Sequence, residues 1–119
     1  MFNKKFKKDF SIWTITMIEK IEPIYSDKEP DKFIINDLGT TSCVGFYRKK
    51  KDAIRVLHKN NCDIRECVYD YAVLEEVREG LYGSGHTEPQ WFKYDYEKDG
   101  FFEIPMPEGE NPYRGYWMW

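Results

Sequence analysis

FSIWTITMIEKI, residues 10–21, is the segment from which the fold can be inferred most directly. β-Branched and aromatic residues dominate it, and such residues fit the pleated surface of a sheet. In an extended chain alternate residues point to the same side, so Trp13, Ile15 and Met17 would share one face. We therefore expect a long first strand here.

Two shorter strands are expected after a break. Pro23 and the polar residues 26–31 interrupt the first strand. Residues 33–35 are a brief apolar run, which predicts a short edge strand. Residues 43–47 (CVGFY) have the composition of a further strand that leads into the next element.

One helix is expected over residues 49–60. The spacing of Ala53, Ile54 and Leu57 places these side chains on a single helical face. Asn60 and Asn61 follow, and asparagine tolerates the left-handed conformation in which helices often end. The pattern predicts one main helix that packs through its apolar face.

The second half of the chain predicts a central strand and a hairpin. Residues 69–77 alternate with a period of two and carry apolar side chains partly on both faces, which is typical of a central strand. Residues 91–94 and 101–104 flank a turn that contains Asp99 and Gly100. We therefore expect an α+β fold, with a mostly antiparallel sheet of about five strands and one main helix packed on a face.

The length of the chain allows one domain. Its 119 residues suffice for a single compact core, and no linker divides them. We expect one domain over residues 1–119, with a basic N-terminal arm at 1–9. Residues 105–119 contain three prolines and are predicted to form an extended aromatic tail.

Charge and hydropathy exclude several classes of protein. The net charge of −3, with both signs in abundance, gives no general attraction for nucleic acid. Basic groups at residues 4–8 and 48–51 are interpreted as solvated faces. Because the sequence has neither a long apolar run nor a signal peptide, we expect a cytoplasmic protein without membrane contact. The three cysteines are an odd, sparse set, for which reduced thiols are expected.

No motif for catalysis is present. His58, Cys62, Cys67 and His86 are suitable zinc ligands, but their spacing lacks the two close pairs of a structural site. Cys43 could act as a nucleophile with His86, yet it lies in a predicted apolar strand, where a packed cysteine is the simpler interpretation. We expect no catalytic residue, metal or cofactor, and hence a protein that is not an enzyme.

Aromatic residues make up 18% of the chain, and several lie near cations in the sequence. A nucleotide base gains about 1–3 kcal/mol by stacking on a ring, and its phosphates suit the planar donors of arginine. The alternative is that these rings pack the core or a subunit contact. Residues 83–85 (GSG) would form a flexible loop that could act as a lid. The candidate ligand-binding residues are Arg48, Tyr82, Trp91, Phe92, Lys93 and Arg114.

Residues 43–104 also carry a family resemblance, in the segments VGFY (44–47), YAVLEE (71–76), GLY (80–82) and WFK (91–93). In these segments the chain resembles small proteins encoded by phages and prophages of clostridia and related bacteria. The resemblance implies a mobile-element origin and a strand–helix–strand–hairpin layout. In size and ring content the chain is also similar to viral sponges for cyclic nucleotide immune signals, such as the first Thoeris anti-defence family.

These observations lead to three hypotheses about function. The first is a phage-type counter-defence protein that sequesters a cyclic or ADP-ribose-like nucleotide without turnover, with Arg48 or Arg114 on the phosphate. The second is a protein–protein inhibitor of a bacterial defence system, similar to anti-CRISPR proteins, anchored by Trp117 and Trp119. The third is an enzyme that acts through Cys43 or His86. Exposed rings would also allow a homo-oligomer with a ligand pocket at its subunit boundary.

Overall fold

The computed structural model describes residues 10–25, 27–28, 33–79 and 89–107. The predicted basic arm at residues 1–9, the glycine loop at 83–85 and most of the predicted tail lie outside the described residues. The same holds for three side chains that were singled out above, Tyr82, His86 and Arg114.

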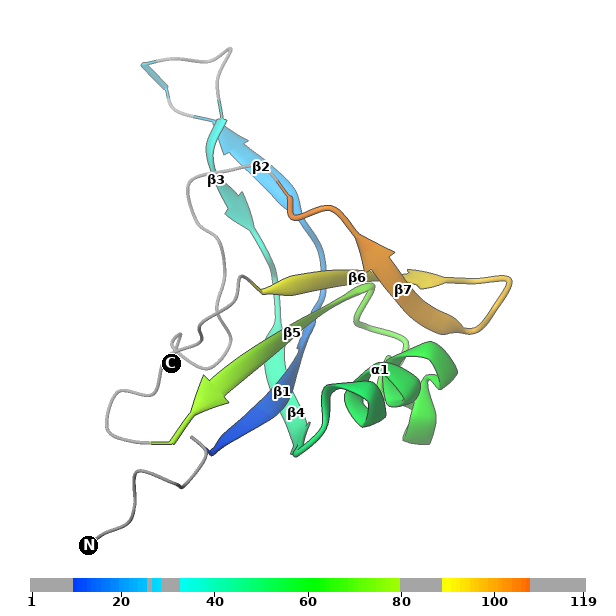
Figure 1. Cartoon of the computed structure of the whole chain (residues 1–119). Helices are drawn as coiled ribbons and strands as arrows, with labels where there is room; N and C mark the ends of the chain where they lie inside the picture. The colour runs from blue at the N-terminus through cyan, green and yellow to red at the C-terminus, as the bar shows by residue number, and fades with distance from the viewer. Residues whose placement is uncertain (1–9, 26, 29–32, 80–88, 108–119) are drawn as a thin grey trace, which may run out of the picture.

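The main element is a five-stranded antiparallel sheet with strand order β4-β1-β5-β6-β7 (Figure 1). One helix, α1 (Lys50–Lys59), packs on a face of this sheet. The α+β prediction, with about five antiparallel strands and one main helix, is confirmed. The strands are β1 (Ser11–Ile18), β4 (Thr41–Tyr47), β5 (Tyr71–Arg78), β6 (Gln90–Asp95) and β7 (Gly100–Ile104).

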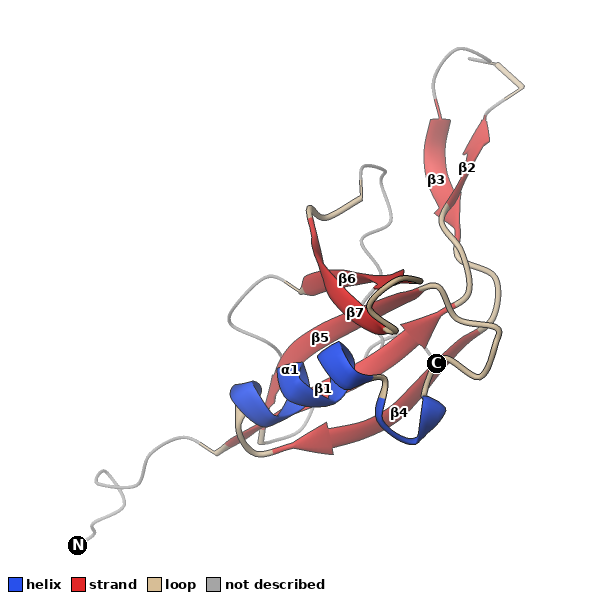
Figure 2. Ribbon diagram, turned by 90° about the vertical axis from the view of Figure 1, so that its right-hand side faces the viewer, coloured by secondary structure: helices blue, strands red, loops and turns tan. Residues whose placement is uncertain are grey.

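A separate two-stranded hairpin was predicted only in part: the short strand expected at residues 33–35 is present as part of β3, but its partner strand was not expected. Pro23 was expected to end extended structure, but it lies inside β2 (Glu22–Tyr25), which pairs with β3 (Phe33–Asp37). Proline is tolerated here because a two-stranded ribbon consists only of edges, where a missing backbone donor costs little. Figures 1 and 2 both show this hairpin extending beyond the main sheet.

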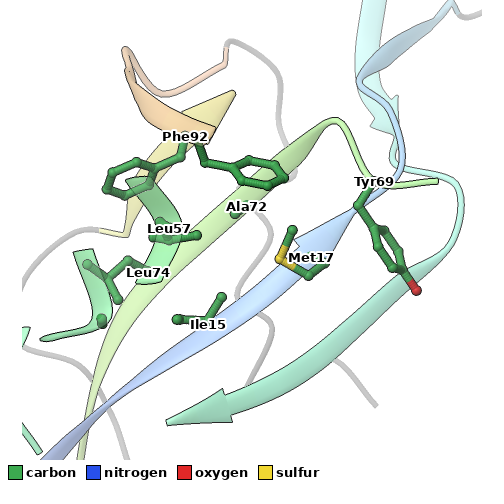
Figure 3. Close-up of a cluster of buried hydrophobic side chains, with 9 residues drawn as sticks. Ile15, Met17, Leu57, Tyr69, Ala72, Leu74 and Phe92 are labelled. Carbon is green, nitrogen blue, oxygen red and sulfur yellow. The ribbon is translucent and has the colours of Figure 1, made fainter. Parts of the chain in front are cut away.

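A hydrophobic core fills the space between α1 and the sheet. Ile15 and Met17 of β1 point toward the helix, as their alternation predicts, and Trp13 packs partly against the same cluster. Figure 3 shows side chains of β1, β5 and β6 converging on Leu57 of the helix. The buried members are Ile15, Met17, Ala53, Leu57, Tyr69, Ala72, Leu74, Phe92 and Phe101.

The opposite face of the sheet is also buried over its central strands. Ile18, Val73 and Trp91 form a second cluster there with Leu38, which follows β3. Strand β5 therefore contributes buried side chains to both faces, and it occupies the middle of the sheet, as expected of a central strand.

A close approach between α1 and the β6–β7 turn fixes the helix on the sheet. A Cβ atom at Gly100 would lie 1.8 Å from the backbone oxygen of His58, so only glycine fits this contact. The helix ends two residues later at Asn60, whose φ of 46° gives the left-handed cap that the sequence predicted.

Candidate functional site

Two of the predicted ligand-binding rings belong to the interior. Trp91 is 3% exposed and Phe92 is 1% exposed. Because they are neighbours on β6, their side chains point to opposite faces of the sheet. Phe92 packs in the core under α1, while Trp91 packs against Val73 on the other face. The core-packing alternative therefore accounts for Phe92.

The two predicted cations that the structure describes are exposed but far apart. Lys93 lies level with Thr41, because the register runs from Lys93 through Tyr71 and Ile18 to Thr41. Arg48 comes seven residues after Thr41 and therefore lies near the other end of β4. At roughly 3.3 Å per residue and 4.8 Å between strands, Arg48 and Lys93 are more than about 20 Å apart. One phosphate cannot contact both.

Trp91 and Lys93 do share a face, the one opposite α1. The Lys93 Nζ lies 5.8 Å from the centre of the Tyr71 ring on the neighbouring strand. Thr16, Val73 and Trp91 form one row across β1, β5 and β6. The Thr16 Oγ1 and the Trp91 Nε1 are both buried without a hydrogen-bond partner. Such unpaired groups are rare in folded proteins, since each costs about 1–3 kcal/mol.

Arg65 is the cation that the structure places between rings, and no local pattern in the sequence indicates it. Its guanidinium carbon lies 4.4 Å from the Tyr94 ring centre and 4.8 Å from that of Tyr96. The same guanidinium donates to an Asp70 carboxylate oxygen at 2.8 Å and to the Tyr96 hydroxyl at 2.7 Å. Arg65 itself lies in the turn that follows the short 3-10 helix η2 (Asn61–Asp63), whereas Tyr94 is on β6, Tyr96 is in the β6–β7 turn and Asp70 directly precedes β5.

The Arg65 cluster is satisfied largely by its own members. The hydrogen bond to Asp70 raises the pKa of Arg65, so this side chain stays charged. The Tyr94 hydroxyl donates to Asp99, and this bond raises the pKa of Tyr94. We interpret the cluster as a clamp that holds the 60–70 segment against the β6–β7 hairpin.

The base of the β2–β3 hairpin is held by charges. The Lys20 Nζ lies 3.2 Å from a carboxylate oxygen of Glu22 and 3.3 Å from one of Asp37, which raises the pKa of Lys20. A hydrogen bond from the Gly39 backbone N–H to the Asp37 carboxylate, together with Lys20, lowers the pKa of Asp37. These contacts join both strands of the hairpin to the end of β1.

Backbone contacts fix the same junction. The Glu19 N–H donates to the Thr40 oxygen at 2.9 Å, and the Lys20 N–H donates to the Leu38 oxygen at 3.2 Å. Leu38 packs in the second core cluster, so the hairpin leaves the body of the protein from a buried residue. Its direction is therefore set by the core.

Beyond this base, strand β2 is fully exposed. All four of its residues, from Glu22 to Tyr25, are exposed. Ile24 is 42% exposed and Tyr25 is 53% exposed. As neighbours in a strand they face opposite sides of the ribbon, so each side presents an apolar side chain. We refer to β2 and β3 together as the arm.

One of the three cysteines, Cys43, differs from what the sequence predicted. Cys43 was interpreted as packed, but it is exposed on β4, an edge strand. Cys62 and Cys67 are also exposed and free. Among the described residues, no three His, Cys, Asp or Glu side chains are grouped in a way that could hold a metal ion. Within the same residues, no helix has the length and hydrophobicity needed to cross a membrane.

Comparison of the chain with protein-family models, with curated proteins and with solved structures found no significant match. The resemblance to phage proteins therefore stays a prediction. The sites themselves supply the observations that bear on function.

Proposed function

We propose that this protein acts by binding another protein, and that the arm is the element that makes the contact. In the phage setting that the sequence resemblance implies, the partner would be a bacterial defence protein in the host cytoplasm. The observation that carries the proposal is the exposure of the apolar side chains of β2, with Ile24 at 42% and Tyr25 at 53%.

The stability of a two-stranded ribbon supports this role. An isolated hairpin is at best marginally stable in water unless a hydrophobic face packs against something. The arm is fastened at its base by Lys20 and Asp37, while the exposed residues of β2 lie beyond that anchor. A partner that covers the apolar side chains would supply the packing, and the fixed base reduces the entropy lost on binding.

The chemistry of the arm indicates the kind of surface it fits. Ile24 and Tyr25 follow Glu22 and Pro23; Pro23 removes one backbone donor from β2, and the charge of Glu22 also discourages ladder extension. Side-chain burial would then dominate the contact. An apolar groove with a polar rim, as found at most specific protein interfaces, is the matching surface.

The test is affinity capture from a bacterial host followed by reconstitution with the purified partner. Ile24→Asp puts a charge on the arm and should weaken binding at least about tenfold, as expected for an anchor residue. Val68→Asp is a matched control, because Val68 is 45% exposed and lies in the turn before β5. A partner that binds both variants equally, or no stoichiometric partner at all, would contradict the proposal.

Nucleotide sequestration is the second candidate, and one observation favours it. The unpaired Trp91 Nε1 and Thr16 Oγ1 lie in one row on the sheet face that Lys93 shares. Both groups are buried, so a phosphate or carbonyl oxygen would accept from them only after displacing the side chains that cover them, and the exposed Lys93 would add a charge. Arg48 is too distant to join this set, so Lys93 would take the role first given to arginine.

Calorimetry against a panel of cyclic and ADP-ribose-like nucleotides tests this candidate. Trp91→Phe keeps a large ring but removes the N–H, so it should weaken binding while preserving the core. Heats at noise level for every nucleotide would exclude the candidate.

A further inference from the structure

We infer that β4 pairs with β4 of a second copy of this chain, so that two five-stranded sheets join into one. Strand β4 is at the edge of the described sheet and is paired with β1 alone. At the other edge, β7 is flanked by α1. The helix lies so close to β7 that a Cβ atom at Gly100 would collide with the His58 backbone oxygen. This proposal concerns a surface separate from the arm and does not depend on the arm's partner.

The composition of β4 is unusual for an edge strand. Edge strands normally carry charges or proline, which discourage pairing with other chains. Strand β4 reads TSCVGFY and has neither, whereas β2 contains Glu22 and Pro23. The described protection of β4 is a bulge at Val44, where the register with β1 shifts and the strand gains twist. Phe46 is 60% exposed and Val44 is 38% exposed.

Strand β4 can pair with a copy of itself in the antiparallel direction without a steric clash. A two-fold axis through Val44 would align Phe46 with Ser42 of the second copy, and Cys43 with Gly45. The bulge pairs Gly45 with Ile15 but Cys43 with Thr16, so the aligned side chains lie on opposite faces of the joined sheet and do not collide. A Cβ atom built at Gly45 has no atom within 4 Å, so the sheet face at this residue is open.

Charges at the two ends of β4 favour the same partner. Arg48 and Lys49 follow the strand and are exposed. Glu19 lies at the beginning of the strand, where its carboxylate accepts from the Thr40 N–H at 2.9 Å. Antiparallel pairing brings the end of one copy to the beginning of the other, so both cations would approach Glu19 of the second copy. The two-fold axis would repeat this contact between opposite charges at both ends of the paired strands, which favours a second copy over an unrelated strand.

Sedimentation of the full chain tests the proposal. We expect a dimer, whose dissociation constant should rise at least about tenfold in Val44→Lys, because two ammonium groups would then face each other. Gly45→Lys should act in the same way, and the open space around Gly45 protects the monomer from damage. Val68→Lys, in the turn before β5 and with an exposure similar to that of Val44, should leave the dimer unchanged.

A cross-link tests the register. In a chain whose three exposed cysteines are replaced by serine, Val44→Cys should give a disulfide-linked dimer on mild oxidation, because equivalent residues meet at the axis. Val68→Cys should give only background cross-linking. A chain that is monomeric at about 100 µM, where micromolar complexes are saturated, would overturn the proposal. Equal cross-linking at both positions, or a β4 that pairs only with a different protein, would do the same.

Discussion

The core beneath α1 and the β2–β3 arm both contain large apolar side chains, but these side chains differ in their exposure to solvent. Under the helix, Ile15, Met17 and Phe92 are almost completely buried. On the arm, Ile24 and Tyr25 remain exposed, and only the base is fastened to the body. The comparison indicates that stability is located in the core, whereas the binding that we propose would be located on the arm, so a substitution in one part should leave the other unchanged.

The largest expected effect is in the core. Phe92→Ala removes a ring that is 1% exposed and should lower the free energy of unfolding by about 3–5 kcal/mol. Ile24→Ala, on the arm, should change it by less than about 0.5 kcal/mol. Urea unfolding of both variants measures the difference. Similar losses would show that the arm is part of the cooperative core.

A pair of glycines sharpens the comparison between packed and open positions. Gly100→Ala forces a methyl group onto the His58 backbone oxygen and should cost roughly 1–3 kcal/mol or more. Gly45→Ala meets open space on β4 and should be nearly neutral. Thermal unfolding followed by circular dichroism distinguishes the two. An unchanged melting temperature for Gly100→Ala would contradict the placement of α1 on the β6–β7 turn.

A smaller effect is expected at the Arg65 clamp. Arg65→Met keeps much of the side-chain volume but loses the hydrogen bonds to Asp70 and Tyr96, at a cost of about 1–2 kcal/mol. Arg55→Met is the control, because Arg55 forms only an exposed ion pair with Asp52 on α1, worth at most about 0.5 kcal/mol. Chemical denaturation provides both values. Equal effects would mean that Arg65 is not a clamp.

The smallest effect concerns pH at the base of the arm. The Gly39 N–H and Lys20 lower the pKa of Asp37, so its contribution to stability is present above the ordinary value of 3.8 and is lost as the pH falls through the lowered pKa. An NMR titration of the Asp37 carboxyl should give a midpoint below 3.8. Lys20→Met should raise this midpoint only in part, because the Gly39 bond remains. A midpoint at or above 3.8 would contradict the described base.

Local patterns made most of the fold predictable. The helix and its left-handed end at Asn60 follow from spacing and residue type, and the alternation of β1 and β5 predicts which side chains are buried. Strand β2 of the arm was missed because Pro23 is a strong local sign of a break, whereas the pairing of β2 with β3 depends on residues further along the chain. Which strands become neighbours is also a property of the whole chain.

The same limit applies to the candidate site. Trp91 and Phe92 are adjacent in a predicted strand, so their opposite faces could have been predicted from alternation alone. The separation of Arg48 from Lys93 depends on the strand order, which no local pattern gives. Arg65 meets Tyr94 and Tyr96 only because the 60–70 segment folds back on the hairpin. Local patterns therefore identified suitable residue types but could not show which of them meet.

Photo-cross-linking in the bacterial host tests most directly whether the arm contacts a partner protein. A photoreactive amino acid placed at Ile24 should yield one dominant cross-linked host protein. The same amino acid at Val68, which is 45% exposed where Ile24 is 42% exposed, should not. Equal cross-linking from both positions, or none from position 24, would contradict a role for the arm in binding.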